Sequence, residues 1–188
     1  MKNHITITGF IEGLRRDLMI MKNSINFQIN PLELREINEL INLSFDVWKK
    51  TYPGIISYAQ IITMLNSRYS NQGIKNDIKK NKSIWLTAKN DYILGFCNYV
   101  PIGISCYEIK IDKLYVNPIY QRSGIATKLL NAVIERHKKI KFLNLQVNRN
   151  NTNALNFYKS FGFKIYKKID IKIEGGYYMN DYFLKLKI

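Results

Sequence analysis

Hydrophobic residues in the first quarter of the chain predict a short strand followed by a helix. Polar and apolar residues alternate over 24–29, which is typical of a strand. Helical spacing follows, in the series Leu34, Ile37, Ile41, Phe45 and Trp48. We expect this helix to begin at Pro31, with Asn30 as its cap and Glu33 reaching back to the N–H of the cap residue.

Alternation with a period of two takes over in the middle of the chain, after two further expected helices. Ser57 is expected to cap the first of these helices, and the second lies near 72–80. Residues 83–88 and 92–99 then predict two strands of a hairpin that turns at 89–91.

A third strand of this region is predicted at 108–116, after a loop at 101–105. Strict alternation would give one of its faces the side chains of Lys110, Asp112, Leu114 and Val116. The other face would carry Ile109, Ile111, Lys113 and Tyr115. A functional carboxylate at Asp112 would therefore share a face with Leu114.

The last third of the chain predicts a helix, a strand, a helix and two strands. The first helix has an apolar stripe made of Ile125, Leu129, Leu130, Val133 and Ile134. A strand at 142–147 and a helix at 152–161 come next, and Gly162 suits the end of that helix. Strands at 163–173 and 178–188 complete one mixed α/β domain.

Length and composition fit a single domain. The 188 residues are enough for one substantial core and short for two. We place the domain at 21–188 and treat 1–20 as an N-terminal extension, within which 9–20 would form a short amphipathic helix if ordered. No stretch approaches the roughly 20 apolar residues of a membrane span. Charged residues among the first twenty argue against a signal peptide, so a cytoplasmic location is expected.

Two other bulk features limit the chemistry. Cys97, Cys106, His4 and His137 lack the spacing of a metal site, so no metal is expected. The net charge of +15 fits a general compositional bias, a polyanionic small molecule or nucleic acid. Nucleic acid is the least favoured of the three, because no block of five or six basic residues occurs.

The segment 114–126 predicts a strand, a tight turn and a helix start. The first turn of a helix has N–H groups without intrahelical partners and a partial positive charge, which together bind anions such as phosphate. Gly124 leaves room for a phosphate, Ala126 is small, and Arg122 adds charge at the rim. A glycine that serves only the turn is the alternative. The G-x-G-x-x-G and Walker A patterns are absent.

Two motifs around this turn resemble those of the GNAT N-acetyltransferase superfamily. Residues 121–126 resemble its Q/R-x-x-G-x-G/A motif, and a strand of the usual L-Y-V-x-P type precedes them at 114–118. Residues 145–163 are similar to its second signature, L-x-V-x-x-x-N-x-x-A-x-x-x-Y-x-x-x-G-F. Residues 48–56 look like the front loop of a bacterial branch with polyamine and small-amine acetyltransferases. The resemblance covers 24–188 and implies a mostly antiparallel, twisted central sheet, splayed between two parallel strands and flanked by helices.

The resemblance implies acetyl-CoA as cosubstrate, in a cleft between the strands that end at Val116 and Val147. Backbone amides of 122–126 would bind the pyrophosphate, and the Val116 amide would bind the thioester carbonyl. Asn151 would contact the pantetheine arm, cap its helix, or do both. The full set expected to bind the cosubstrate is Leu114, Tyr115, Val116, Gln121, Arg122, Ser123, Gly124, Ile125, Ala126, Thr127, Asn151 and Tyr158.

The same resemblance implies acid–base roles. Tyr158 would give its hydroxyl proton to the departing thiolate, although packing in the core is the plain alternative. Asp112 is the candidate base, and a salt bridge with a lysine is the alternative. Glu108 is a weaker candidate, and Lys110 stands where other relatives carry an acid. No cysteine occupies a motif position, so direct attack in a ternary complex is expected.

The acceptor is expected to be a primary amine of a small molecule or peptide. Trp48 and Tyr52 would form an aromatic wall for a cationic amine or pack under the front loop. The segment 177–182, with Tyr178 as the candidate contact, would close the opposite wall. The high positive charge argues mildly against a polycationic acceptor, unless Asp112, Glu108 and Asp181 make the cleft acidic. The rivals are a noncatalytic acyl-CoA-binding module and a basic nucleic-acid- or ribosome-associated protein. The sequence leaves the oligomeric state open, a homodimer included.

Overall fold

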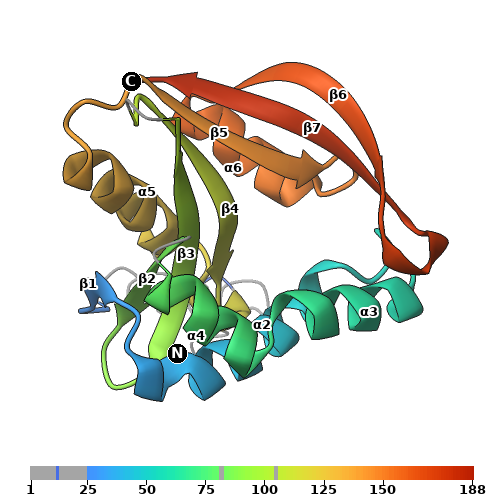
Figure 1. The fold of residues 1–188 in the computed structure, drawn as a ribbon, viewed down its shortest axis with the longest axis horizontal. Coiled ribbons are helices and arrows are strands. Elements are labelled where there is room, and N and C mark those ends of the chain that lie inside the picture. Colours follow the sequence, from blue (N-terminus) through green and yellow to red (C-terminus); the bar gives the residue numbers. More distant parts are fainter. Residues whose placement is uncertain (1–11, 13–24, 81–82, 104–105) are drawn as a thin grey trace, which may run out of the picture.

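A computed structural model describes residues 12, 25–80, 83–103 and 106–188. The extension at 1–20 and the helix expected within it lie outside these residues, apart from Glu12. The described part contains a sheet with the strand order β1-β2-β3-β4-β5-β7-β6 (Figure 1). The strands are β1 (Gln28–Pro31), β2 (Ile84–Lys89), β3 (Ile93–Ile102), β4 (Glu108–Val116), β5 (Phe142–Asn148), β6 (Lys164–Lys172) and β7 (Tyr178–Lys187). Neighbours are antiparallel except for β4 and β5, which are parallel.

Helices cover the sheet and divide the core in two. They are α2 (Ile37–Thr51), α3 (Tyr58–Arg68), α4 (Asn71–Lys79), α5 (Ile125–Arg136) and α6 (Thr152–Phe161). The first three pack with Trp85 and Phe96 of the sheet into one buried cluster. The last two pack with β3, β4 and β5 into another, around Leu129 and Leu143. Among the described residues, no helix is long and apolar enough to cross a membrane.

The predicted start of the first helix is wrong. Asn30 and Pro31 belong to β1 and pair with β2, and the Leu32 N–H continues the pairing by donating to the Trp85 carbonyl at 3.0 Å. Proline is tolerated here because β1 is an edge strand. The reciprocal capping arrangement exists three residues later, between Glu33 and Glu36, and opens a 3₁₀ turn (Leu34–Glu36) ahead of α2.

A bulge in β4 overturns the predicted alternation. Lys113 pairs with Asn98, but Ile111 pairs with Tyr99, so Asp112 is an extra residue without a partner on β3. As a result Ile111 and Leu114 both pack into the cluster around α5. The prediction that Asp112 and Leu114 share a face by strict alternation is therefore wrong, since the extra residue interrupts the alternation between them. The predicted loop at 101–105 is also shorter, because β3 continues through Ile102.

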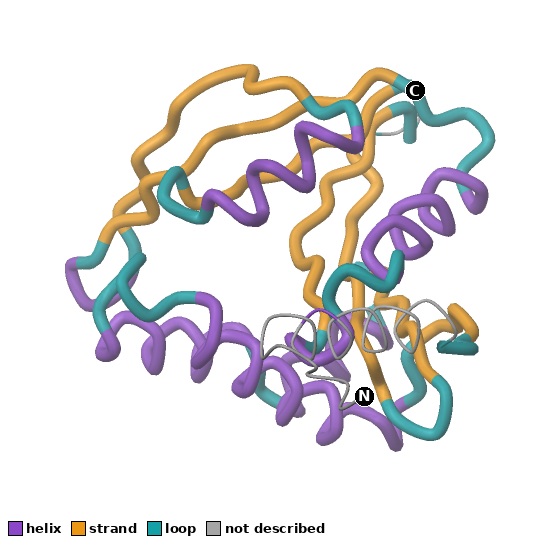
Figure 2. Tube along the Cα trace, turned by 180° about the vertical axis from the view of Figure 1, so that it is seen from behind, coloured by secondary structure: helices purple, strands orange, loops and turns teal. Residues whose placement is uncertain are grey.

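The bulge coincides with the point where β4 and β5 part. Their parallel pairing runs from Glu108 opposite Phe142 to Ile111 opposite Leu145 and stops there. Beyond this point β5 stays paired only with β7, up to Asn148 opposite Asp181. Bulges bend the strand that carries them. Figures 1 and 2 show the two parts of the sheet diverging, with β2–β4 in one and β5–β7 in the other.

Gly95 of β3 permits the close packing of α5 on the sheet. A Cβ at this position would lie 2.8 Å from the Tyr115 carbonyl oxygen and 3.1 Å from Cγ2 of Ile125. Gly95→Ala is therefore expected to destabilise the fold by about 1–3 kcal/mol through overpacking. Urea unfolding measures this change, with Asn131→Ala on the exposed face of α5 as the control. An unfolding midpoint equal to that of the wild type would show that the neighbouring atoms of Tyr115 and Ile125 move to accept the methyl group without loss of stability.

Candidate active site

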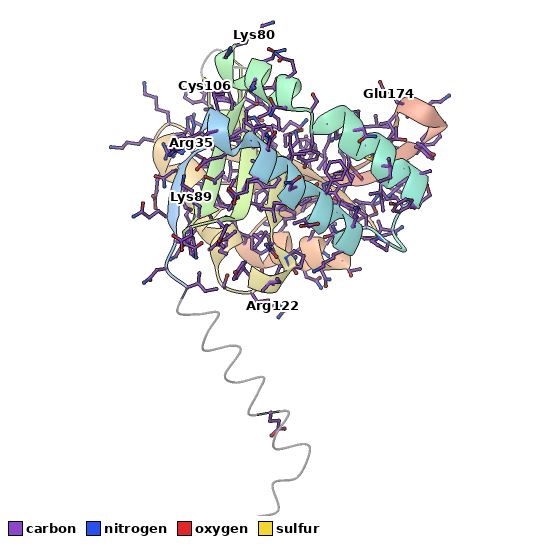
Figure 3. The ribbon with its side chains drawn as sticks, turned by 90° about the horizontal axis from the view of Figure 1, so that it is seen from below. Arg35, Lys80, Lys89, Cys106, Arg122 and Glu174 are labelled. Carbon is purple, nitrogen blue, oxygen red and sulfur yellow. The ribbon has the colours of Figure 1, made fainter. Side chains whose placement is uncertain are left out.

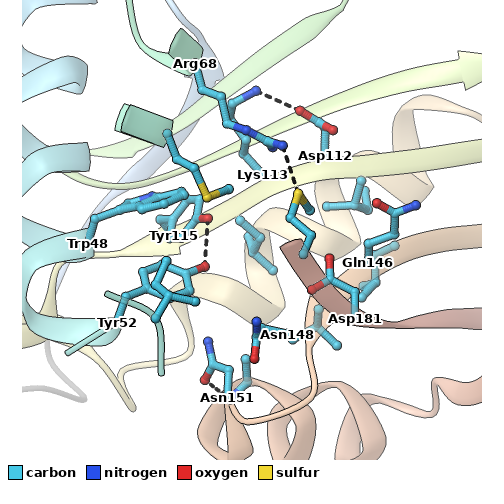
Figure 4. Close-up of a pocket in the computed structure, with 18 of the residues that line it drawn as sticks. Trp48, Tyr52, Arg68, Asp112, Lys113, Tyr115, Gln146, Asn148, Asn151 and Asp181 are labelled. Atoms are coloured by element: carbon cyan, nitrogen blue, oxygen red, sulfur yellow. Dashed lines mark hydrogen bonds and ion pairs between the residues drawn. The ribbon is translucent and has the colours of Figure 1, made fainter. Parts of the chain in front are cut away.

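A pocket opens where β4 and β5 diverge. Residues 110–115 of β4 and 145–148 of β5 form two of its walls, and α6 contributes Asn151, Ala154 and Tyr158. The front helices and β7 close it, through Trp48, Tyr52, Ile56, Gln60, Met64, Arg68, Met179 and Asp181 (Figure 4). The pocket thus lies between the two parts of the sheet.

The predicted phosphate-binding turn lies beyond the end of β4, outside the lining of this pocket. Gly124 is the N-cap of α5, with φ +80°, and nothing lies within 4 Å of the position its Cβ would take. No hydrogen bond outside the helices and strands of the described residues is donated by a backbone N–H of 121–127. Arg122 also has a positive φ, of 68°, and lies at the outer edge of the molecule (Figure 3). Free donors and open space at one helix start fit a diphosphate.

The Val116 N–H points away from β3. Val116 lies opposite Gly95, and the next residue, Asn117, donates its N–H to the Leu94 carbonyl at 2.8 Å. Because N–H groups alternate sides along a strand, the Val116 N–H faces the side from which β5 has diverged. It is therefore available to a ligand that enters between the two strands.

Asn151 and Tyr158 line the pocket from α6. The Asn151 side chain accepts a hydrogen bond from the Ala154 N–H at 3.1 Å, so it does cap the helix, as one of its two expected roles requires. Tyr158 is only 8% exposed, and its ring packs edge-on against Phe163. Burial raises the pKa of the Tyr158 hydroxyl, which therefore keeps its proton at neutral pH.

Asp112 is held by two lysines. Its carboxylate lies 2.7 Å from Nζ of Lys113 and 3.3 Å from Nζ of Lys110. Burial alone would raise the pKa of Asp112, but the charge and hydrogen bond of Lys113, followed by Lys110, lower it below its usual value. A carboxylate of this kind is a poor proton acceptor, which favours the salt-bridge interpretation. Glu108 pairs with Lys185 at 3.1 Å and does not line the pocket.

Asp181 is the other carboxylate of the pocket, on β7. It is 3% exposed, and burial raises its pKa to about 6, although Arg68 and Arg149 act in the opposite direction. The sequence predicted Asp181 as a source of negative charge and as part of the segment 177–182 at the acceptor wall, but not as a base. Its signal was that it is the single acidic residue of the final strand.

Of the three residues expected to contact the acceptor, Trp48 and Tyr52 line the pocket and Tyr178 does not. The Trp48 and Tyr52 rings lie 4.5 Å apart, and the Tyr52 hydroxyl lies 3.2 Å from that of Tyr115. These side chains belong to the buried front cluster and also line the pocket, so packing and wall formation coincide. Tyr178 is 51% exposed and is absent from the lining. Its neighbours Met179 and Asp181 occupy that wall instead.

Several pocket residues have no counterpart in the sequence-based expectations. They are Gln60, Met64 and Arg68 of α3, and Gln146 and Asn148 of β5. Those of α3 carry no motif, and the packing of α3 against α2 and against the β6–β7 turn brings them to the site. Nowhere in the described ranges do three or more His, Cys, Asp or Glu side chains gather in a group that could hold a metal ion.

Known proteins share these features. The model of the acetyltransferase (GNAT) family matches residues 39–163. The spermidine N(1)-acetyltransferase of Thermoplasma acidophilum is 30% identical over 146 residues, which cover 74% of this chain and 89% of that protein. The uncharacterized N-acetyltransferase YafP of Escherichia coli is 31% identical over 129 residues, covering 66% and 82%.

A solved structure agrees with the fold. The crystal structure of the PaiA N-acetyltransferase from Thermoplasma acidophilum in complex with coenzyme A matches with a TM-score of 0.73 and 26% identity, over 87% of this chain and 100% of that one. The expected family, fold class and cosubstrate are thereby confirmed. The chain belongs to the GNAT family and is an acetyl-CoA-dependent N-acetyltransferase.

Proposed function

We propose that this enzyme acetylates the primary amine of a small molecule by direct attack in a ternary complex. The observation that supports it best is one pocket, open between β4 and β5, that is lined by both Tyr158 of α6 and Asp181 of β7. The name of the spermidine-acetylating relative favours a small amine. Cys97 is fully buried, outside the lining, and has a raised pKa, so it is no candidate for a covalent acetyl carrier. A cytoplasmic location stays a prediction from the sequence.

The residues of the turn and of β4 would hold the cosubstrate, which supplies the activated acetyl group. The free N–H groups from Arg122 to Ala126 would donate to the diphosphate, where Gly124 leaves the approach open. The Val116 N–H would donate to the carbonyl oxygen and stabilise the negative charge that develops on it. Asn151 would keep its capping role while it borders the same channel.

Two side chains would move the protons. Above pH 6 the Asp181 carboxylate is mostly ionised, and it would take a proton from the acceptor's ammonium group, leaving a nucleophilic amine. The Tyr158 hydroxyl, which keeps its own proton, would give it to the leaving sulfur. Asp112 would hold Lys110 and Lys113 in place through its ion pairs and would take no part in proton transfer, because its lowered pKa makes it a poor base.

A direct assay tests this function. The purified protein, acetyl-CoA and a panel of small amines are incubated, and both the released CoA thiol and the mass of the acetylated product are measured. Equal amounts of thiol and acetylated amine would support the proposal. Stabilisation by acetyl-CoA without any acetylated product would instead favour the noncatalytic module. Salt-sensitive binding of oligonucleotides without any stabilisation by acetyl-CoA would favour the nucleic-acid-binding rival.

Gly124→Glu is expected to abolish stabilisation by acetyl-CoA. A carboxylate would stand where the diphosphate belongs, and glutamate is strained at φ +80°. For the wild type, acetyl-CoA at about 100 times its Kd should stabilise the fold by ~2.7 kcal/mol. Thermal unfolding with and without acetyl-CoA measures the difference. Gly124→Ala, which adds the same strain without the charge, is the control and should keep part of the shift.

A further inference from the structure

The acceptor end of the pocket carries more positive than negative charge. Its lining includes the cations Arg68, Lys110 and Lys113 and the carboxylates Asp112 and Asp181. With every group ionised, three positive and two negative charges leave a net charge of +1. Below pH 6 Asp181 is mostly protonated, and the net charge approaches +2. The pocket is therefore not the acidic site that a polycation requires.

Arg68 is the source of this excess. Lys110 and Lys113 are both paired with Asp112, whereas Arg68 forms no ion pair with any carboxylate of the described residues. Its one hydrogen bond within the described part of the chain runs from Nη2 to Sδ of Met179, at 3.2 Å. A thioether is a weak acceptor, while a guanidinium has five N–H donors. Most of the donors of Arg68 thus remain unused.

The position of Arg68 suits an incoming ligand. It is the last residue of α3, it is half-buried, and it lines the pocket together with Asp112 and Asp181 (Figure 4). Arg35 and Arg149 do form ion pairs, with Glu33 and Asp170. Arg122 and Arg136 form none among the described residues, but neither lines this pocket. A half-buried guanidinium that lines a pocket and has a thioether as its protein acceptor is prepared for an anion from solution.

We propose that Arg68 binds a carboxylate of the acceptor, so that the acceptor is an amino acid or a similar small molecule with both a primary amine and a carboxylate. Guanidinium and carboxylate match in a planar, bidentate pair. The carboxylate at Arg68 would leave the ammonium group to Asp181, and both ends of a zwitterion would then meet opposite charge. The inference rests on the proposed function, because it names the substrate class of the same pocket.

The test compares amino acids with the amines left when their carboxylate is removed. The pairs are leucine with isopentylamine, β-alanine with ethylamine, and δ-aminovalerate with butylamine, and cadaverine and spermidine represent polyamines. For at least one pair we expect kcat/KM to favour the amino acid about 10-fold or more, the size of one charge-assisted contact. If every carboxylate-free amine or a polyamine is acetylated as well as the best amino acid, the inference is overturned while the proposed function stands. If acetyl-CoA binds but nothing in the panel is acetylated, both fail.

Variants of Arg68 assign the preference to this side chain. Arg68→Gln should lower the ratio of kcat/KM for the amino acid to kcat/KM for its carboxylate-free partner by about 10-fold, mainly through the KM of the amino acid. Arg68→Lys should keep part of the preference. Arg35→Gln is the matched control and should change neither value, since Arg35 is exposed and absent from the pocket lining. Calorimetric titration of the preferred amino acid into the protein with CoA gives the same comparison without turnover. A preference that survives Arg68→Gln in both measurements would refute the assignment.

Discussion

Asp181→Asn should lower kcat/KM by about 10²–10⁴-fold and, at the same time, make the fold more stable above pH 6. The loss of rate follows because an amide cannot take the proton of the acceptor's ammonium group. The gain of stability follows because a carboxylate that is 3% exposed is costly to ionise, and asparagine stays neutral. A residue that weakens the fold in its working state is typical of a functional site.

The pH dependence gives the sign of both effects. The pKa of Asp181 is about 6 in the folded protein against 3.8 in the unfolded chain, so the folded state binds more protons between these values. The free energy of unfolding therefore decreases as pH rises from 3.8 to 6, because the buried carboxylate becomes ionised. Above pH 6 the full decrease, on the order of 2–3 kcal/mol, is present. For the wild type, kcat/KM should rise through pH 6 as the carboxylate ionises.

Urea unfolding at pH 5 and pH 8, together with the pH profile of kcat/KM, measures these changes. Asp91→Asn, in the exposed turn between β2 and β3, is the control and should alter neither. A rate that falls at Asp181→Asn without any change in the pH profile would point to positioning of the acceptor instead of proton transfer. An unchanged rate would remove Asp181 from the mechanism.

Tyr158→Phe should lower kcat by about 10²–10⁴-fold and leave the stabilisation by acetyl-CoA intact. The hydroxyl makes no hydrogen bond that holds the fold together among the described residues, so its removal should change the free energy of unfolding little. The ring remains and still packs against Phe163. Steady-state kinetics and thermal unfolding with acetyl-CoA test the two halves of this expectation.

Tyr166→Phe is the matched control for the loss of a phenolic hydroxyl. Tyr166 is 70% exposed on β6 and outside the pocket, so its variant should keep wild-type kinetics. If Tyr158→Phe also turned over at the wild-type rate, water or another group would have to protonate the leaving thiolate. A rate that returns with acyl donors whose leaving thiol is more acidic would support the proposed role of Tyr158.

Elements with strong local signals were predictable from the sequence. The strand at 108–116 and the helix at 152–161 have the predicted bounds. Asn151 and Gly162 mark the ends of that helix by their own chemistry, one as an N-cap and the other with φ +110°. Ser57 caps α3 through the Gln60 N–H, also as expected. In each case the determining contacts lie within a few residues along the chain.

Features set by distant contacts were not predictable in this way. Pairing of Asn30 and Pro31 with β2 overrides a good local helix start, because the partner strand lies more than fifty residues away. The bulge at Asp112 depends on the register with β3 and leaves no local mark. Arg68 and Asp181 reach the pocket only when α3 and β7 pack beside it, so the charge of the acceptor end could not be read from any motif.

Because the parallel pairing of β4 with β5 is short, the second half of β4 has no neighbouring strand on one side within the described part of the free protein. Past Ile111, the main-chain N–H groups of β4 that face away from β3 have no partner strand among the described residues. A bound ligand would take the place of that strand and accept their hydrogen bonds. Amide hydrogen exchange at Leu114 and Val116, whose N–H groups face away from β3, should therefore be fast in the free enzyme and slow in the loaded one. Deuterium uptake at these positions would therefore measure how much of the protein has ligand bound, because binding and protection of the β4 amides would occur together.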